Sequence, residues 1–393
     1  MGRQTGCIYK SKNGERWLAR WREKVTENGE AKAKLRFRDL APVNDAYRTA
    51  RDVQPLLDEI LAPINAGKVK PESTLSVADY GENSWLPWIR ENCKPSTIHG
   101  YEFVWASHLE PRLRKVALRD FRTVDAANIL TELYRARGFG RTMLKHCKSI
   151  LSGIFTLARN QGVLDAPNPV QGTMLPKRAA PPKETHAATP DEVMAILEAI
   201  ATAKVEEKRI TKVHRLKAQA AIALQFFAGL RPGEARGARW EDYDGKRLTV
   251  RQSVWRTHTT TPKTEESAKA VPIIETLAVI LAGLREANGN PTTGPILRGL
   301  SGKPLNLDNF RRKVLLPLLQ AAKIEWHGWY SLRRGVATTI ASLSKDPLAS
   351  KGLLRHSSLA TTAKHYIKDV PENTQEAMNR LEQLFNDCST TRH

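Results

Sequence analysis

A proline-rich stretch near the middle of the chain is the feature that most restricts how these 393 residues can fold. Residues 165–190 hold six prolines, scattered Lys and Arg, and few apolar side chains. Because proline fixes φ and cannot donate a backbone hydrogen bond, such a stretch favours an extended connection over a packed element. Helical apolar patterning lies on both sides of it. The sequence therefore predicts separate domains joined by a linker at residues 166–188.

Residues 1–66 predict a small module built on a three-stranded sheet. Three runs alternate apolar and polar residues with the period of a strand: 8–10, 17–22 and 32–38. Asn13-Gly14 and Asn28-Gly29 are hairpin turn signals between these runs, and a helix through roughly residues 44–66 follows. The third run alternates cations with apolar residues, which predicts a basic face. We interpret the module as a sheet that lies against DNA, the alternative being a solvated edge strand.

Residues 74–165 predict a helical domain. Apolar residues recur at helical spacing there, most clearly in the stretches 124–135 and 140–161. A cluster of Arg and Lys at residues 112–122 lies beside these stretches, and we expect it to meet phosphates.

Residues 189–393 predict a second, larger helical domain. Thr189 is a helix N-cap residue with Pro190 at the first helical position, and helical patterning continues to about residue 380. Two short strands near residues 248–250 and 270–273 should form a hairpin. The predicted fold class is thus mainly α (α+β): a small N-terminal three-stranded sheet module, a helical domain, and a mostly helical C-terminal domain with a small hairpin.

The charge of the chain points to a polyanionic partner. Formal net charge is +21 and the pI is about 9.9. A membrane surface is the rival partner, but no apolar run approaches the roughly 20 residues that span a bilayer, and the first residues contain no apolar signal-peptide core. We therefore expect nucleic acid as the partner, no membrane, and a cytoplasmic setting.

The cysteines do not predict a metal site or a disulfide framework. They are scattered singly along the chain: Cys7, Cys93, Cys147 and Cys388. No CxxC pair is present and no His/Cys cluster has zinc-ligand spacing, so we expect neither a metal nor a cofactor.

Two short motifs in the C-terminal half place cations at exposed breaks. Residues 229–234 read GLRPGE; the glycine suits a helix end and the proline the first turn of the next helix, so Arg231 should project from the break, with Glu234 placed to orient it. Lys263 lies on a polar turn between the two predicted strands. Taken singly, the first is an ordinary surface ion pair and the second an ordinary surface lysine.

Two further motifs follow in the same half. In residues 326–334, WHGWYSLRR, Tyr330 and Arg333 flank a buried stripe near a helix start, where backbone N–H groups favour an anion. His356 opens a short polar turn, and Tyr366 lies on the helix after it. A single tyrosine in such a place is normally a packing residue.

With all four motifs in this order, the chain resembles the tyrosine recombinase family, which includes the phage integrases. The resemblance covers residues 189–393 closely, as the catalytic domain, and residues 74–165 more loosely, as the core-binding domain. It also implies that residues 1–66 are an arm-type DNA-binding module. It implies a nucleophilic Tyr366, a general-acid Lys263, and phosphate stabilisation by Arg231, Arg333 and His356. The chemistry it implies is DNA cleavage through a 3′-phosphotyrosine intermediate, without a metal or nucleotide cofactor.

Three departures from the family's motifs concern the site. Tyr330 stands where His is usual; a phenol can donate a hydrogen bond to phosphate but shuttles protons poorly. Arg355 stands where Gly is usual, and it could bind phosphate or pack. Tyr366 lies ten residues after His356 rather than nine.

The function predicted from the sequence is a site-specific recombinase that integrates or excises a mobile element. The resemblance implies double-stranded DNA attachment sites, a homo-tetramer on DNA, and an accessory bending or directionality factor as partners. One alternative is a type IB topoisomerase, which shares the nucleophile. The other is a DNA-binding regulator on a decayed recombinase fold.

Overall fold

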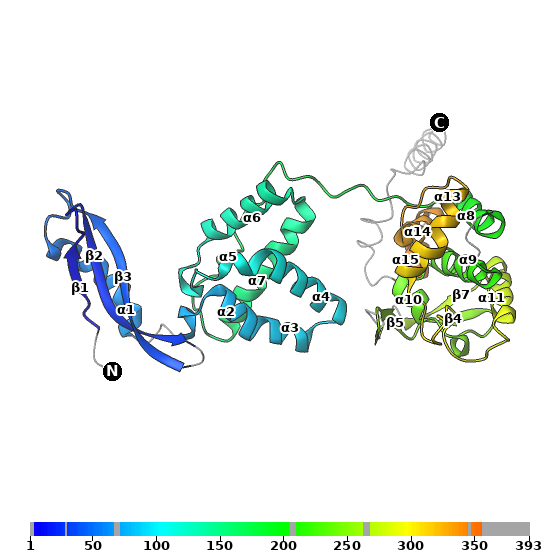
Figure 1. The fold of residues 1–393 in the computed structure, drawn as a ribbon, viewed down its shortest axis with the longest axis horizontal. Coiled ribbons are helices and arrows are strands. Elements are labelled where there is room, and N and C mark those ends of the chain that lie inside the picture. The colour runs from blue at the N-terminus through cyan, green and yellow to red at the C-terminus, as the bar shows by residue number, and fades with distance from the viewer. Residues whose placement is uncertain are drawn as a thin grey trace, which may run out of the picture. The chain divides into compact units, whose positions relative to one another are not determined.

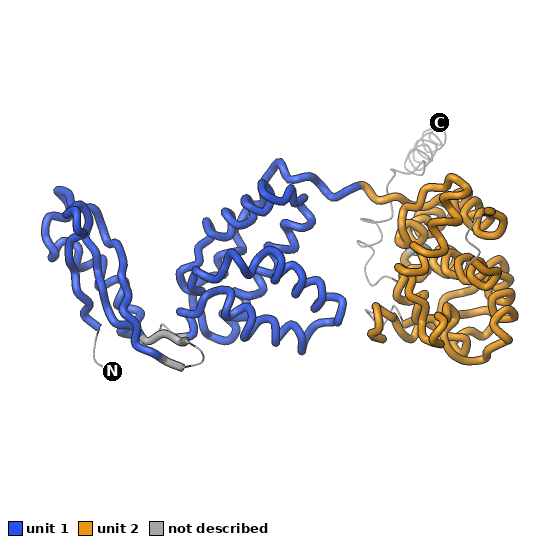
Figure 2. The backbone as a smooth tube through the Cα atoms, viewed as in Figure 1, with its two compact units in different colours: residues 1–183 blue, residues 184–393 orange. Residues whose placement is uncertain are grey.

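The computed structural model divides into two compact units, Met1–Lys183 and Glu184–His393 (Figure 2). The structure describes the following residues: 4–27, 30–66, 71–204, 210–261, 268–344 and 347–355. Within these residues, no helix is long and apolar enough to cross a membrane.

The first unit begins with the predicted antiparallel sheet. Strands β1 (Cys7–Lys10), β2 (Arg16–Glu27) and β3 (Glu30–Pro42) lie in the order β1-β2-β3, and α1 (Ala50–Asn65) packs on one face (Figure 1). The buried side chains between sheet and helix come from β2, β3 and α1: Trp17, Ala19, Trp21, Ala41, Val53, Leu57 and Leu61. The helix starts later than the sequence predicted, at a capping box formed by Thr49 and Asp52.

The cations of β3 lie together on one face of the sheet, and α1 packs on that same face. Trp21 pairs with Arg36 across β2 and β3, so the cations of β3 share the face that the helix covers, and Arg36 lies 3.5 Å from the buried Glu23. The apolar Leu35 and Phe37 are instead exposed, on the open face. The tryptophans of β2 decide this orientation, because burying them against α1 fixes which side of every paired strand faces outward.

The open face is cationic nonetheless. Arg20 pairs with Phe37 and Arg22 pairs with Leu35, so exposed guanidinium and apolar side chains alternate across it. The guanidinium of Arg20 also lies over the ring of Tyr9 at 5.8 Å.

The rest of the first unit is helical, as predicted. Its main helices, in chain order, are α2 (Val77–Tyr80), α3 (Leu86–Asn92), α4 (Pro95–Val104), α5 (Glu110–Leu113), α6 (Thr123–Arg137) and α7 (Arg141–Asn160). Trp85 and Trp105 lie at the centre of one core. Gly81 is required there, because a Cβ at this position would meet the ring of Trp105 at 2.3 Å.

The cations at residues 112–122 are largely paired with carboxylates. Arg112 bonds Glu132, and Arg114 bonds Glu110. Arg119 donates to both carboxylate oxygens of Glu23, which ties the N-terminal sheet to the helical part of the unit. These arginines therefore form ion pairs within the protein. The sequence had predicted contacts with phosphates and not these ion pairs.

The first half of the proline-rich stretch packs against α7. Val170 is fully buried, and Lys148 on α7 donates to the carbonyls of Gln171 and Thr173. Arg141 likewise donates to the carbonyl of Lys177. The prolines of this stretch have no backbone N–H that would need a partner. Backbone carbonyls of the stretch accept hydrogen bonds from Lys148 and Arg141 of α7.

The second unit is a helical domain with two small hairpins. Its helices are α8 (Pro190–Thr202), α9 (Lys212–Phe226), α10 (Pro232–Gly237), α11 (Glu275–Ala287), α12 (Leu307–Phe310), α13 (Leu316–Ala321), α14 (Trp329–Ser344) and α15 (Pro347–Leu354). Its strands are β4 (Arg247–Thr249), β5 (Ser253–Trp255), β6 (His258–Thr260) and β7 (Ala270–Pro272). β4 pairs with β7 as predicted, and β5–β6 is a further hairpin between them.

Helix α9 is the centre of this domain. Its residues 217, 218 and 220–226 are all buried, four of them alanines, and it packs against α8, α11 and α14. Small side chains on several sides of one helix allow its neighbours to approach closely. This packing brings α14 beside the end of α9.

Segment 184–189 lies directly on α14. The Ala188 N–H donates to the carbonyl of Ser331 at 3.0 Å, and the guanidinium of Arg334 donates to the carbonyl of His186 at 2.7 Å. A Cβ on Gly335 would lie 2.0 Å from the Ala188 oxygen. Only glycine at this position allows the contact.

We predict that Gly335→Ala destabilises the protein by about 1–3 kcal/mol, the usual cost of overpacking. Urea denaturation followed by circular dichroism measures it. The matched control is Gly283→Ala in α11, where a Cβ has 3.8 Å of clearance and alanine should be neutral or stabilising by up to about 1 kcal/mol. Equal stability of the two variants would contradict the close contact.

Candidate active site

Arg231 lies at the break between α9 and α10, as the sequence predicted. Gly229 adopts φ +57° after the end of α9, and Pro232 begins α10. Glu234, in the first turn of α10, accepts hydrogen bonds from the Arg231 backbone N–H at 3.0 Å and from its guanidinium at 2.6 Å. The Arg231 side chain is 26% exposed while that of Glu234 is 2% exposed, so a buried carboxylate holds a guanidinium that reaches the surface.

Helix α10 also lies close against the β5–β6 hairpin. A Cβ on Gly233 would lie 2.5 Å from the side-chain oxygen of Ser253, and a Cβ on Gly237 would lie 2.5 Å from the backbone oxygen of Gln252. Arg236 donates to the carbonyls of Val254 and Arg256 in the hairpin, at 3.0 and 2.7 Å. The sequence did not predict a role for Arg236, because its partners are backbone carbonyls, which every residue has.

Arg333 projects from α14 into the same place. It is 1% exposed and donates to the carbonyls of Gly229 and, at 2.7 Å, Leu354. Its Nη1 lies 3.8 Å from the Glu234 carboxylate. Arg333 therefore joins three segments that are distant in sequence: the end of α9, helix α14 and the end of α15.

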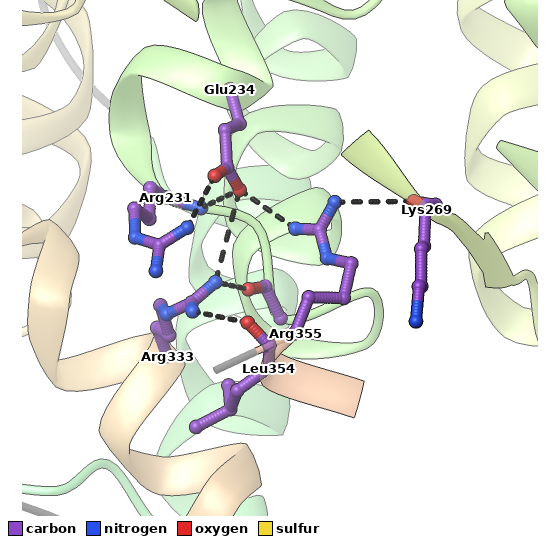
Figure 3. Close-up of polar contacts among 7 residues, drawn as sticks. Arg231, Glu234, Lys269, Arg333, Leu354 and Arg355 are labelled. Carbon is purple, nitrogen blue, oxygen red and sulfur yellow. Dashed lines mark hydrogen bonds and ion pairs between the residues drawn. The ribbon is translucent and has the colours of Figure 1, made fainter. Parts of the chain in front are cut away.

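Arg355 completes the cluster from the end of α15 (Figure 3). It is 3% exposed, and its Nη2 donates to Glu234 at 2.7 Å from the side opposite Arg231. Its Nη1 reaches the carbonyl of Lys269 at 3.5 Å, next to β7. Of the two roles left open by the sequence, phosphate binding or packing, the structure shows the packing role.

Three guanidinium groups thus surround one buried carboxylate. Burial by itself raises the pKa of Glu234, but the charges of Arg355, Arg231 and Arg333 outweigh it, and the pKa lies below its ordinary value of 4.5. Burial lowers the pKa of Arg355, yet a guanidinium remains protonated at neutral pH. The cluster keeps an excess of two positive charges, which favours an anion at its exposed edge.

The remaining predicted site residues are only partly placed. Tyr330 lies in the first turn of α14, 53% exposed, three residues before the buried Arg333. Lys263, His356 and Tyr366 lie outside the residues that the structure describes. The structure therefore brings together Arg231 and Arg333 and adds Glu234 and Arg355 to them.

Comparisons with known proteins support one family. No family model matches the chain. A curated protein of Caldanaerobacter subterraneus subsp. tengcongensis, described as tyrosine recombinase XerC-like, is 23% identical over 368 residues, which cover 86% of this chain and 90% of that protein.

Solved structures share the fold. The Tn1549 transposon integrase in complex with transposon right end DNA has a TM-score of 0.64 and 17% identity, over 78% of this chain and all of that chain. A lambda integrase dimer bound to a COC′ core site has a TM-score of 0.54 and 19% identity, over 91% of this chain and 94% of that chain. The fold is that of the integrases. In sequence, the chain is similar to a tyrosine recombinase XerC-like protein.

We predict that Glu234→Gln lowers the free energy of unfolding by about 3–5 kcal/mol at pH 7, because it leaves buried guanidinium groups without a counter-charge. The matched control is Glu198→Gln, which removes an exposed carboxylate on α8. Denaturant titration of both variants measures the difference, and equal stability would contradict the role of Glu234.

The same carboxylate should make stability depend on pH. Because its folded pKa is depressed, its stabilisation is complete above the unfolded value near 4.5 and is lost as pH falls through the folded pKa. Below about pH 5, the wild-type chain should therefore lose stability more steeply than Glu234→Gln. Parallel acid dependences would count against the depressed pKa.

Proposed function

We propose that this chain is a site-specific DNA recombinase that cuts and rejoins DNA through a 3′-phosphotyrosine intermediate, with Tyr366 as nucleophile. The observation that carries the proposal is the cluster of Arg231, Arg333 and Arg355 around Glu234. Its excess positive charge suits the transition state of phosphodiester attack, in which negative charge gathers on the non-bridging oxygens.

We expect the three arginines of the cluster to have different roles in the reaction. Arg231 reaches the surface and is the guanidinium that can meet a phosphate, with the forked geometry that suits two oxygens. Glu234 fixes its direction before substrate arrives, so little reorganisation is needed during the reaction. Arg333 and Arg355 supply charge from inside and hold the surrounding segments.

The remaining chemistry follows from the family's motifs. Tyr366 attacks the phosphorus while Lys263 protonates the leaving 5′ oxygen, and His356 donates to a non-bridging oxygen. The phosphotyrosine bond keeps the energy of the broken linkage, so a second 5′-hydroxyl can reverse the step. Tyr330, exposed at the start of α14, donates a further hydrogen bond to the phosphate.

The other parts of the chain would bind the DNA duplex. We assign residues 74–165 as a core-binding domain and residues 1–66 as an arm-type module, whose open face offers Arg20 and Arg22 beside Phe37. Related integrases have been solved with transposon-end DNA, with a core site, and as a tetramer on a Holliday junction. By analogy, this chain would act as a homo-tetramer on two attachment sites of a mobile element, with an accessory bending or directionality factor.

We predict that Tyr366→Phe retains DNA binding but forms no covalent adduct with a nicked suicide substrate, because phenylalanine lacks the attacking oxygen. Adducts are measured on denaturing gels and binding by mobility shift. The matched control is Tyr330→Phe, which removes the other phenol of the site and should still form adduct at a reduced rate. Undiminished adduct in Tyr366→Phe would refute the nucleophile.

Tyr330→His should retain or raise the rate of cleavage, since imidazole donates to the phosphate and also shuttles protons near neutral pH. Single-turnover cleavage of the same substrate measures the rate. Complete loss of cleavage with intact DNA binding would show that Tyr330 has another role.

A further inference from the structure

Three metal-binding side chains meet in the second unit, apart from the arginine cluster. They are His186 in segment 184–189, Glu192 in the first turn of α8, and His327 just before α14. One ring nitrogen of each histidine and one oxygen of the carboxylate lie within 4.8 Å of one another. No spacing pattern in the sequence marks this site, because its three residues come from separate segments.

The geometry brings the three groups close and partly shields them. His186 Nε2 lies 2.8 Å from Glu192 Oε2, and the two imidazole rings lie with their centroids 3.9 Å apart and their planes tilted by 31°. The side chains of His186 and His327 are 33% and 31% exposed, so they border solvent without being fully hydrated. An ion could therefore enter without opening the fold.

Further contacts hold Glu192 and the segment that carries His186. Glu192 Oε2 also accepts the Thr189 backbone N–H at 2.8 Å within the capping box of α8. The carbonyl of His186 accepts from Arg334 at 2.7 Å, which fixes this segment on α14. Such outer contacts orient ligands in metal sites and keep their arrangement before the ion arrives.

We propose that His186, Glu192 and His327 bind one divalent transition-metal ion of the zinc type. Two imidazole nitrogens and one carboxylate, with water as the fourth ligand, form a set typical of tetrahedral Zn²⁺, whereas Mg²⁺ and Ca²⁺ require mostly oxygen ligands. Tetrahedral ligand atoms lie about 3.3–3.5 Å apart. On binding, His186 Nε2 and Glu192 Oε2, now 2.8 Å apart, would therefore separate slightly, while donors that lie up to 4.8 Å apart would move closer.

The ion would link segment 184–189, which leads into the catalytic domain, to the residues just before α14. It would join segment 184–189 and α8 to His327, which lies three residues before Tyr330. The site is thus a structural one that holds the polypeptide leading into the helix of Arg333, and it takes no part in the chemistry.

Zn²⁺ binding to the metal-free full chain, without DNA, tests the proposal by calorimetric titration. We expect one site that His186→Gln and His327→Gln each weaken by tenfold or more, because glutamine keeps a hydrogen bond but is a poor metal ligand. The matched control is His258→Gln, which removes an exposed histidine of β6 and should leave this site intact. Mg²⁺ in excess should not displace the bound Zn²⁺.

Zn²⁺ should also raise the melting temperature of the wild-type chain and of the control, but not that of the two cluster variants. Equal Zn²⁺ affinity in the cluster variants and the control would overturn the proposal, as would displacement by Mg²⁺. Because no DNA is present, neither result bears on the proposed recombinase activity.

Discussion

The carboxylate of Glu234 is the group on which the arrangement of the candidate site depends. Removing a carboxylate from water costs several kcal/mol unless opposite charges and hydrogen bonds compensate for it. Here the compensation comes from Arg231 beside α10, Arg333 on α14 and Arg355 after α15. Because each guanidinium lies on a different element, the charge balance of one buried group requires all three elements to converge.

Close contacts at glycine residues also position the elements that carry the charged side chains. Gly233 and Gly237 let α10 lie against β5, and Gly335 lets segment 184–189 lie on α14. A contact between backbones, as at Gly237 and Gly335, leaves less freedom than one between long side chains, so these glycines restrict where the adjoining segments can lie. The ends of the elements that carry the cations are thereby positioned.

Much of the local structure could be predicted because its causes are local. Thr189 and Pro190 start α8 through an N-cap and a proline at the first helical position, and β4 pairs with β7. The face of the N-terminal sheet could not be predicted from β3 alone, because Trp21 on β2 decides which side α1 covers. The sequence also could not predict that the Arg355 side chain points inward, because its partner Glu234 is far away in the sequence.

The sequence by itself determined the mainly helical class, the N-terminal sheet, and the order of the motifs that carry Arg231, Tyr330 and Arg333. Those features depend on residue types and on spacings of a few residues, and both can be read from the sequence before the chain folds. Only the tertiary structure decided which arginine is exposed, which are buried around Glu234, and that His327 meets Glu192. Such pairings depend on how separate helices pack, because burial and charge compensation act between segments that no short pattern connects.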